Sequence, residues 1–376
     1  MNDEIAEPDR VEGAPHPRAT THLFGHHAAE ASFLAAYNAG RLHHGWLISG
    51  PRGVGKATLA WRLARFLLAT PIADGGMFDP PAPTTLDIGP DHPVVRRMVA
   101  MAEGRLFLLR RGLNDKETAL SADIRVDEVR KMKSFFTLSA ADGGRRVSII
   151  DCADDMTPNA ANALLKLLEE PPANVTLFLI SHQPHRLLPT IRSRCRELRL
   201  APLPPDILAD ALVAAGGTLD ASDVQAMAEL AGGSVGEAFR LTNQDGLGVY
   251  GGLIKLLTTL PRLDRPAALT LAEKAAGRGV DSQFDLIVTL VDLFLARLAR
   301  AAATNTRPPD AALGEAALIT RLGAAPGAAL AWADLAQTLT IRARRGRAVN
   351  LDPAALLMDM LLKIDETAGT LLATRA

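Results

Sequence analysis

The chain contains 376 residues, which is too many for one ordinary hydrophobic core and suits about two or three domains. Its 41 Lys and Arg residues nearly balance its 42 Asp and Glu residues, so no overall field draws the protein onto nucleic acid or an anionic membrane. The only cysteines, Cys152 and Cys195, exclude a disulfide framework and a four-thiolate zinc site and favour a reducing compartment.

Residues 1–22 are acidic, contain several prolines and hold few apolar side chains. A secretory signal needs a basic start followed by an apolar run, so we predict a disordered tail instead. No apolar stretch in the chain approaches the roughly 20 residues that span a bilayer. We therefore expect a soluble cytoplasmic protein with no membrane partner.

Residues 23–201 alternate short apolar runs with amphipathic segments, a pattern typical of helices packed on a mostly parallel sheet. The buried-type runs predict strands at Trp46–Ser49, Val147–Ile150 and Val175–Ile180. A helix at residues 56–68 follows the first of them. The fold class predicted for this part is α/β.

A second helix between the last two strands has clear punctuation. Thr157 can cap it, Pro158 occupies a first-turn position that tolerates proline, and Pro171 with Pro172 ends it. Its apolar face is formed by Leu164, Leu165 and Leu168. Residues 70–91, rich in Pro, Gly and Asp, predict a poorly ordered loop.

Strand signals fade after residue 201 and the chain becomes almost entirely helical. We expect a small helical unit at residues 202–245, a linker in NQDGLGVYGG (243–252), and five or six Ala/Leu-rich helices in residues 246–376. The helix breaks are expected at Pro261, Pro308 with Pro309, Pro326 and Pro353. The apolar stripe of residues 284–299 suits either a core or a subunit interface.

A phosphate-binding loop is indicated at residues 50–58, because the pattern G-x-x-x-x-G-K is complete there. Backbone N–H groups and a helix N-terminus in this context bind phosphate oxygens, and Lys56 can supply a positive charge. Ala57, however, replaces the hydroxyl residue that normally holds magnesium, and Thr58 points about 100° away around the helix. The candidate cofactor-binding residues are Gly50, Gly53, Val54, Gly55, Lys56, Ala57 and Thr58. A glycine-rich turn without nucleotide is the alternative.

Nucleotide hydrolysis also needs an acidic pair at the end of a second strand. Asp151 is present in the sequence IIDCAD, but Cys152 occupies the position of the general base. Asp154 and Asp155 follow in a predicted turn, and we do not expect either to replace the base.

Four segments, GPRGVGKAT, VSIIDCADDM, NAANALLKLLEEPP and TIRSRC, occur in an order that resembles clamp-loader subunits of the AAA+ class. Within that class the chain is most similar to the delta-prime family of bacterial DNA polymerase III, and the match covers about residues 24–204. The resemblance implies an AAA+ P-loop domain at residues 23–201, a helical lid domain at 202–245 and an all-α collar domain at 246–376.

The resemblance also implies a function, that of a stator in a machine that loads a sliding clamp onto primed DNA. Such a subunit does not hydrolyse ATP but supplies an arginine finger to its neighbour, and the matching residue is Arg194. The implied partners are the gamma/tau motor and delta subunits, with the clamp contacted indirectly. The alternative for Arg194 is a solvated basic edge, shared with Arg186, Arg192, Arg196 and Arg199.

Clamp-loader motors carry a second arginine in a segment that resembles GSLRDAL, and this chain has Gly236 at that position. Together with Ala57 and Cys152, this predicts that ATP or ADP is bound without hydrolysis. The DNA polymerase III holoenzyme synthesises DNA, but no residue here resembles a polymerase site. An active ATPase motor and a generic helix-rich adaptor are the rival functions.

Many clamp-loader subunits hold zinc in a four-cysteine module, but residues 70–104 of this chain contain no cysteine. We expect no zinc and no metal ligands, since His92 and His182 belong to no spaced ligand cluster. The cationic stretch Arg342, Arg344, Arg345 and Arg347 is interpreted as the last turn of a helix that stops at Gly346. DNA contact is its alternative function.

Overall fold

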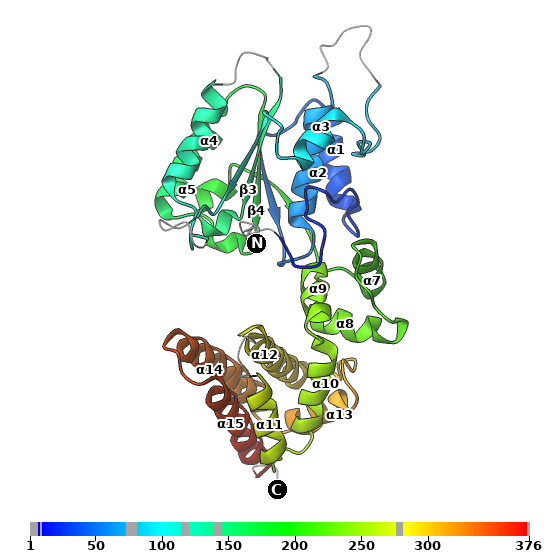
Figure 1. The fold of residues 1–376 in the computed structure, drawn as a ribbon, viewed down its shortest axis with the longest axis vertical. Helices are drawn as coiled ribbons and strands as arrows, with labels where there is room; N and C mark the ends of the chain where they lie inside the picture. The colour runs from blue at the N-terminus through cyan, green and yellow to red at the C-terminus, as the bar shows by residue number, and fades with distance from the viewer. Residues whose placement is uncertain are drawn as a thin grey trace, which may run out of the picture. The chain divides into compact units, whose positions relative to one another are not determined.

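The computed structural model describes residues 7, 10–72, 81–113, 120–138, 144–275 and 281–373 (Figure 1). The chain divides into two compact units, one of Met1–Thr218 with Gly232–Phe239 and one of Leu219–Ala231 with Arg240–Ala376. The first unit is α/β and the second is helical. These units do not coincide with the four predicted domains, whose boundaries stay predictions.

A five-stranded parallel sheet in the order β2-β3-β4-β1-β5 forms the centre of the first unit. The strands are β1 Gly45–Ser49, β2 Leu106–Arg110, β3 Arg146–Asp151, β4 Val175–Ser181 and β5 Arg196–Arg199. All residues of β1 and β4 are buried, because helices cover both faces of a parallel sheet. The three strands predicted from buried runs are confirmed.

Helices cover the two faces of this sheet (Figure 1). One face packs on α1 His27–Asn38, α2 Lys56–Ala69 and α3 Pro93–Val99, around a core that includes Phe33, Trp46 and Trp61. The other packs on α4 Val126–Leu138, α5 Pro158–Glu169 and the short α6 Pro189–Arg192. The three-layer arrangement confirms the predicted α/β class and its parallel sheet.

Helix α5 begins and ends as its punctuation predicts. The Thr157 hydroxyl accepts a hydrogen bond from the Ala160 N–H at 3.3 Å, and Pro158 occupies the first turn. The described part of the predicted loop, residues 70–72 and 81–91, contains neither helix nor strand, while residues 73–80 lie outside the described residues.

Part of the predicted N-terminal tail lies against the first unit. The Arg65 guanidinium donates to the carbonyl of Arg18 at 2.9 Å, and Glu7 forms ion pairs with Arg18 at 2.7 Å and with Arg110 at 3.3 Å. The rings of His16 and Trp61 pack in a T-shaped arrangement, with their centroids 6.1 Å apart. Glu7, His16 and Arg18 thus contact the first unit, while other residues of this segment, such as Glu12 and Pro15, are exposed, and the disordered tail stays a prediction.

The chain after the sheet is helical throughout the described residues, as predicted. Its helices are α7 Pro205–Ala214, α8 Val224–Ala231, α9 Val235–Asn243, α10 Gly246–Leu257, α11 Arg265–Ala275, α12 Asp281–Thr304, α13 Glu315–Gly323, α14 Ala328–Ala348 and α15 Pro353–Ala373. Six of them lie within residues 246–373, and helices end shortly before each predicted proline break.

Two details of the helical region correct the sequence interpretation. The linker predicted at residues 243–252 is wrong for most of its length, because α10 begins at Gly246 and buries Tyr250 with Leu253 and Ile254. That burial outweighs the roughly 1 kcal/mol that each interior glycine costs a helix. Nor does α14 stop at Gly346, since the helix continues to Ala348.

Gly346 serves packing instead of termination. A Cβ on this residue would lie 2.6 Å from Cδ2 of Leu356, so glycine leaves room for the Leu356 side chain against α14. The stripe of residues 284–299 is core within the second unit, where Phe284, Leu290 and Phe294 are at most 2% exposed. In the described residues no single helix is long and apolar enough to cross a bilayer, and one strongly bent pair, α13 with α14, qualifies only when taken together.

Candidate nucleotide-binding site

The loop between β1 and α2 has the backbone shape that the glycine pattern predicts. Gly50, Gly53 and Gly55 all have positive φ angles, of 147°, 74° and 103°. A Cβ on Gly50 would lie 2.3 Å from the carbonyl oxygen of Leu200. Only glycine suits these positions, so the turn from strand to helix is held tightly at the carboxyl edge of the sheet.

Lys56 is the first residue of α2, and its side chain is only 3% exposed. Its ammonium group donates to the carbonyl of Gly50 at 2.8 Å and to the carbonyl of Pro51. Burial lowers the pKa of Lys56 to about 8, and the negative charges of Asp151 and Asp154 only partly offset this effect. The lysine therefore closes its own loop, and a phosphate would have to draw it away from two carbonyls.

A buried histidine that sequence reasoning missed also holds the loop. A ring nitrogen of His26 lies 2.8 Å from the carbonyl oxygen of Val54, and the residue is 6% exposed. Burial lowers the pKa of His26, so the ring is neutral at pH 7 and donates this bond from one nitrogen. The only available signal was a pair of adjacent histidines, His26 and His27, at the start of the first helix.

The two positions after the lysine are Ala57 and Thr58, which lie in the first turn of α2. Ala57 is partly buried against the core that surrounds α2, and Thr58 is the next residue of the same helix. Successive helical residues are rotated by about 100°, so the Thr58 hydroxyl cannot occupy the place of a hydroxyl on residue 57.

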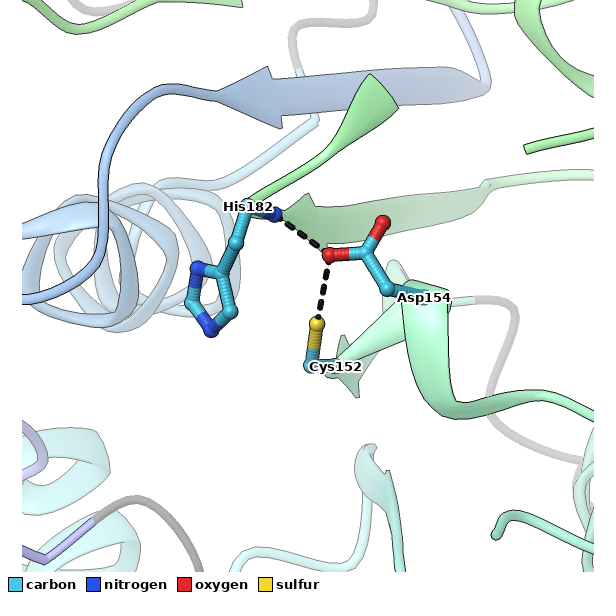
Figure 2. Close-up of side chains that lie close together, drawn as sticks. All are labelled: Cys152, Asp154 and His182. Carbon is cyan, nitrogen blue, oxygen red and sulfur yellow. Dashed lines mark hydrogen bonds between the residues drawn. The ribbon is translucent and has the colours of Figure 1, made fainter. Parts of the chain in front are cut away.

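The end of β3 carries Cys152 and Asp154, which are joined by a hydrogen bond (Figure 2). The Cys152 thiol donates to Oδ2 of Asp154 at 3.0 Å, and burial together with this bond raises the pKa of Cys152 well above its usual range. The sulfur is therefore a neutral thiol at pH 7. It cannot act as a general base or as an activated nucleophile.

The carboxylate of Asp154 joins the end of β3 to the end of β4. It accepts from the Ser181 hydroxyl at 2.6 Å and from the backbone N–H groups of His182 at 2.5 Å and Gln183 at 3.2 Å. Burial alone would raise the pKa of Asp154, but the hydrogen bonds from Ser181 and Cys152 outweigh it and lower the pKa. Asp155 instead faces Arg111 at 3.3 Å.

His182 lies beside Cys152 and Asp154, contrary to the expectation that it belongs to no ligand cluster. Figure 2 shows the three side chains gathered where β3 and β4 end. The interpretation failed because it considered spacing along the chain, whereas residues that follow two neighbouring parallel strands meet at one sheet edge. Burial, helped by the charges of Lys56 and Arg52, lowers the pKa of His182 to about 4.

Gly236 contacts the loop through its backbone. Its N–H donates to the carbonyl of Gly53 at 3.1 Å, and the Ser234 hydroxyl caps α9 by accepting from the Glu237 N–H at 3.1 Å. A Cβ on Gly53 would lie 2.2 Å from Oγ of Ser234. The first turn of α9 therefore covers the loop at the point where motor subunits are expected to place an arginine.

Arg194 lies at the opposite edge of the same sheet. Its carbonyl is 3.2 Å from the position that a Cβ on Gly45 would occupy, and Gly45 begins β1, whereas the loop follows Ser49 at its end. These ends are separated by about 13 Å, since a strand rises about 3.3 Å per residue.

The guanidinium of Arg194 is held within its own chain by weak contacts. It forms an ion pair with Glu169 at 2.9 Å and donates to the carbonyl of Thr190 at 3.1 Å. The side chains of Arg194 and Glu169 are 37% and 49% exposed, so the ion pair contributes at most about 1 kcal/mol. The arginine is accessible at the surface of the first unit.

Comparisons with known proteins identify relatives of part of this chain. Residues 25–204 match the family described as DNA polymerase III, delta subunit. The chain is 41% identical over 165 residues to DNA polymerase III subunit delta' of Pseudomonas aeruginosa, covering 43% of this chain and 44% of that protein. It is 33% identical over 217 residues to subunit delta' of Escherichia coli, covering 56% and 58%. The match thus spans about half the length of these relatives.

The chain is also 31% identical over 189 residues to DNA polymerase III subunit gamma/tau of Mycobacterium tuberculosis, covering 50% of this chain and 30% of that protein. Among solved structures, a gamma subunit-related protein of Thermotoga maritima aligns with a TM-score of 0.40 at 18% identity, over 89% of this chain and 99% of the other. A likeness at that level supports no argument about function. Residues 25–204, which contain both the loop and Arg194, thus match the family described as DNA polymerase III, delta subunit, over a little less than half of this chain.

Proposed function

We propose that this protein is a non-catalytic stator of the bacterial DNA polymerase III clamp loader, which supplies Arg194 as an arginine finger to an adjoining subunit. In this role it assists the ATP-driven loading of a sliding clamp onto primed DNA. Its partners are the gamma/tau motor and delta subunits, and it contacts the clamp only through them.

The observation that carries the proposal is the separation of Arg194 from the loop of its own chain. The two lie at opposite edges of one parallel sheet, so Arg194 cannot reach a phosphate held by Lys56 of the same molecule. A half-exposed guanidinium in a weak surface pair is free to move to a new anionic partner. Such a group stabilises the charge that develops on a transferring phosphoryl group.

Loss of hydrolysis in this chain rests on three separate positions. Ala57 offers no ligand to magnesium, Cys152 is a neutral thiol where a carboxylate is needed, and Gly236 presents only backbone to the loop. Replacement of any one could be compensated by a neighbour. Asp154 and Asp155 do not compensate for Cys152, because the Asp154 carboxylate accepts hydrogen bonds from the end of β4 and Asp155 faces Arg111.

Hydrolysis by the purified chain separates the stator from its rival, an active AAA+ motor. We expect the chain alone to release no phosphate above background, while its addition to motor, delta and clamp raises the ATPase of the mixture. Phosphate release by the chain alone that disappears in Lys56→Ala would favour the motor. Failure to join the complex or change its turnover would favour a generic adaptor.

We further propose that the loop binds ATP or ADP without hydrolysing it. The strand, the glycine turn and the helix N-terminus present N–H groups to phosphate, and Lys56 supplies the charge. A fluorescent ATP analogue should bind the wild-type chain and bind Lys56→Ala at least about tenfold more weakly, since a buried charged contact is lost. Arg52→Ala, which removes an exposed cation of the same loop, is the matched control. Equal affinity of Lys56→Ala and wild type would rule out this loop as the binding site.

A further inference from the structure

We propose that Cys152, Asp154 and His182 form a binding site for a single zinc ion at the end of β3 and β4. Each residue offers one ligand atom, and the three atoms lie within 4.8 Å of one another (Figure 2). Thiolate, carboxylate and imidazole are the ligand types that zinc prefers. The site is distinct from a four-cysteine module, which the sequence of this chain cannot form.

The ligand atoms are already close to the geometry that an ion requires. Sγ of Cys152 lies 3.0 Å from Oδ2 of Asp154, joined by a hydrogen bond from the thiol. When zinc replaces that proton, the proton leaves to solvent and the sulfur binds as a thiolate. The thiolate and the carboxylate then bring two negative charges, which balance the double charge of the ion.

His182 contributes an imidazole that is suited to coordinate metal. Its Nδ1 is buried and has no hydrogen-bond partner among the described residues, so a lone pair or an N–H group is left unsatisfied. The backbone N–H of the same residue donates to Asp154 at 2.5 Å, which fixes the histidine beside the carboxylate. Either ring nitrogen of a neutral histidine can bind a metal ion when the other carries the proton.

The surroundings orient the carboxylate as outer-sphere partners orient ligands in known zinc sites. The Ser181 hydroxyl donates to Oδ1 of Asp154 at 2.6 Å, and the Gln183 N–H donates to Oδ2 at 3.2 Å. Three protein ligands leave one position of a tetrahedral ion for water. The ion would thus occupy the sheet edge where hydrolysing relatives are expected to place the general base.

Metal content and spectroscopy test this site without any assay of activity. The full-length chain without an affinity tag is incubated with zinc chloride, passed through a desalting column and analysed for metal, and we expect about one ion per chain. Cobalt chloride in place of zinc should give an intense near-ultraviolet thiolate-to-cobalt charge-transfer band and the visible bands of a tetrahedral complex.

Two variants identify the ligands, and a third variant serves as a matched control. Cys152→Ser and His182→Gln should each lower zinc affinity by at least about tenfold, and Cys152→Ser should abolish the charge-transfer band. Cys195→Ser, which changes the other cysteine of the chain, should leave both unchanged. Circular dichroism establishes that each variant is folded.

Three results would overturn the proposal. They are a folded wild-type chain that retains no zinc, a cobalt complex without a thiolate band, and zinc affinity that is the same in Cys152→Ser as in wild type. None of these results would contradict the proposed stator role, which depends on Arg194 at the other edge of the sheet. Conversely, unchanged turnover of the complex after replacement of Arg194 would leave the zinc site standing.

Discussion

The cationic side chains at the two edges of the parallel sheet differ in burial and in the contacts that hold them. At the edge where the strands end, Lys56 is 3% exposed and is held by carbonyls of its own loop. At the edge where they begin, Arg194 is 37% exposed and is held by a surface ion pair with Glu169 and a hydrogen bond to the carbonyl of Thr190. The cation of the candidate phosphate-binding loop is therefore enclosed, whereas the cation proposed to act on a neighbouring subunit is accessible. This contrast supports a subunit that assists catalysis elsewhere.

Replacing Arg194 tests the accessible edge and should have the largest effect. In the assembled complex, Arg194→Ala is expected to lower the ATPase rate by about a thousandfold, the lower end of the range for arginine fingers, because developing phosphoryl charge loses its cation. Single-turnover hydrolysis by complexes purified by gel filtration measures the chemical step directly.

The neighbouring Arg192 provides the control for this variant. It is exposed on the same short segment, so Arg192→Ala removes an equal charge without removing the proposed finger. Arg194→Lys should recover little of the activity, since an ammonium lacks the planar fork of a guanidinium. If Arg194→Ala and Arg192→Ala turn over ATP at the same rate, the arginine is only part of a solvated basic edge.

A glycine substitution tests the enclosed edge and should have an intermediate effect. Gly53→Ala places a Cβ 2.2 Å from Oγ of Ser234 in a residue with φ of 74°, so we expect the first unit to lose about 1–3 kcal/mol of unfolding free energy. Urea unfolding followed by tryptophan fluorescence can measure the loss, because Trp46 and Trp61 both lie in this unit.

Gly40→Ala separates backbone strain from packing in this experiment. Gly40 has a φ of 64°, but a Cβ there meets no atom within 4 Å, so only the strain of about 1 kcal/mol is expected. Equal losses for the two variants would show that the first turn of α9 does not cover the loop in solution.

The fold of the first unit was predictable where burial is two-sided and caps are specific. Strands β1, β3 and β4 are continuous apolar runs, and α5 is bounded by a threonine cap and prolines. The edge strand β5 has the sequence RELR, of which only Leu198 is buried, so its pattern gives no strand signal. Helix α10 was missed because its glycines disfavour a helix locally, and only the packing of the helical unit offsets them.

The candidate site was predictable along the chain but not across it. The glycine loop and Cys152 form local patterns. His26 contacts Val54 and His182 contacts Asp154, and each of these pairs is separated by 28 residues in the sequence. The strand order places β4 between β1 and β3, which brings the residue after β4 to the loop and to Cys152 at once. Nothing in a single sequence fixes that order.

The smallest effect is expected for the residue that restrains the finger. Glu169→Ala removes the carboxylate that pairs with Arg194 at 2.9 Å, and a pair this exposed contributes about 0.2–1 kcal/mol. If this ion pair must open before Arg194 reaches a neighbouring phosphate, removing the pair raises the ATPase rate of the complex by no more than about fivefold. That factor corresponds to a barrier lowered by about 1 kcal/mol. Glu170→Ala, one residue further along, is the control. A large fall in rate for Glu169→Ala alone would mean that the pair positions the arginine, and the accessible edge would then be a pre-organised site.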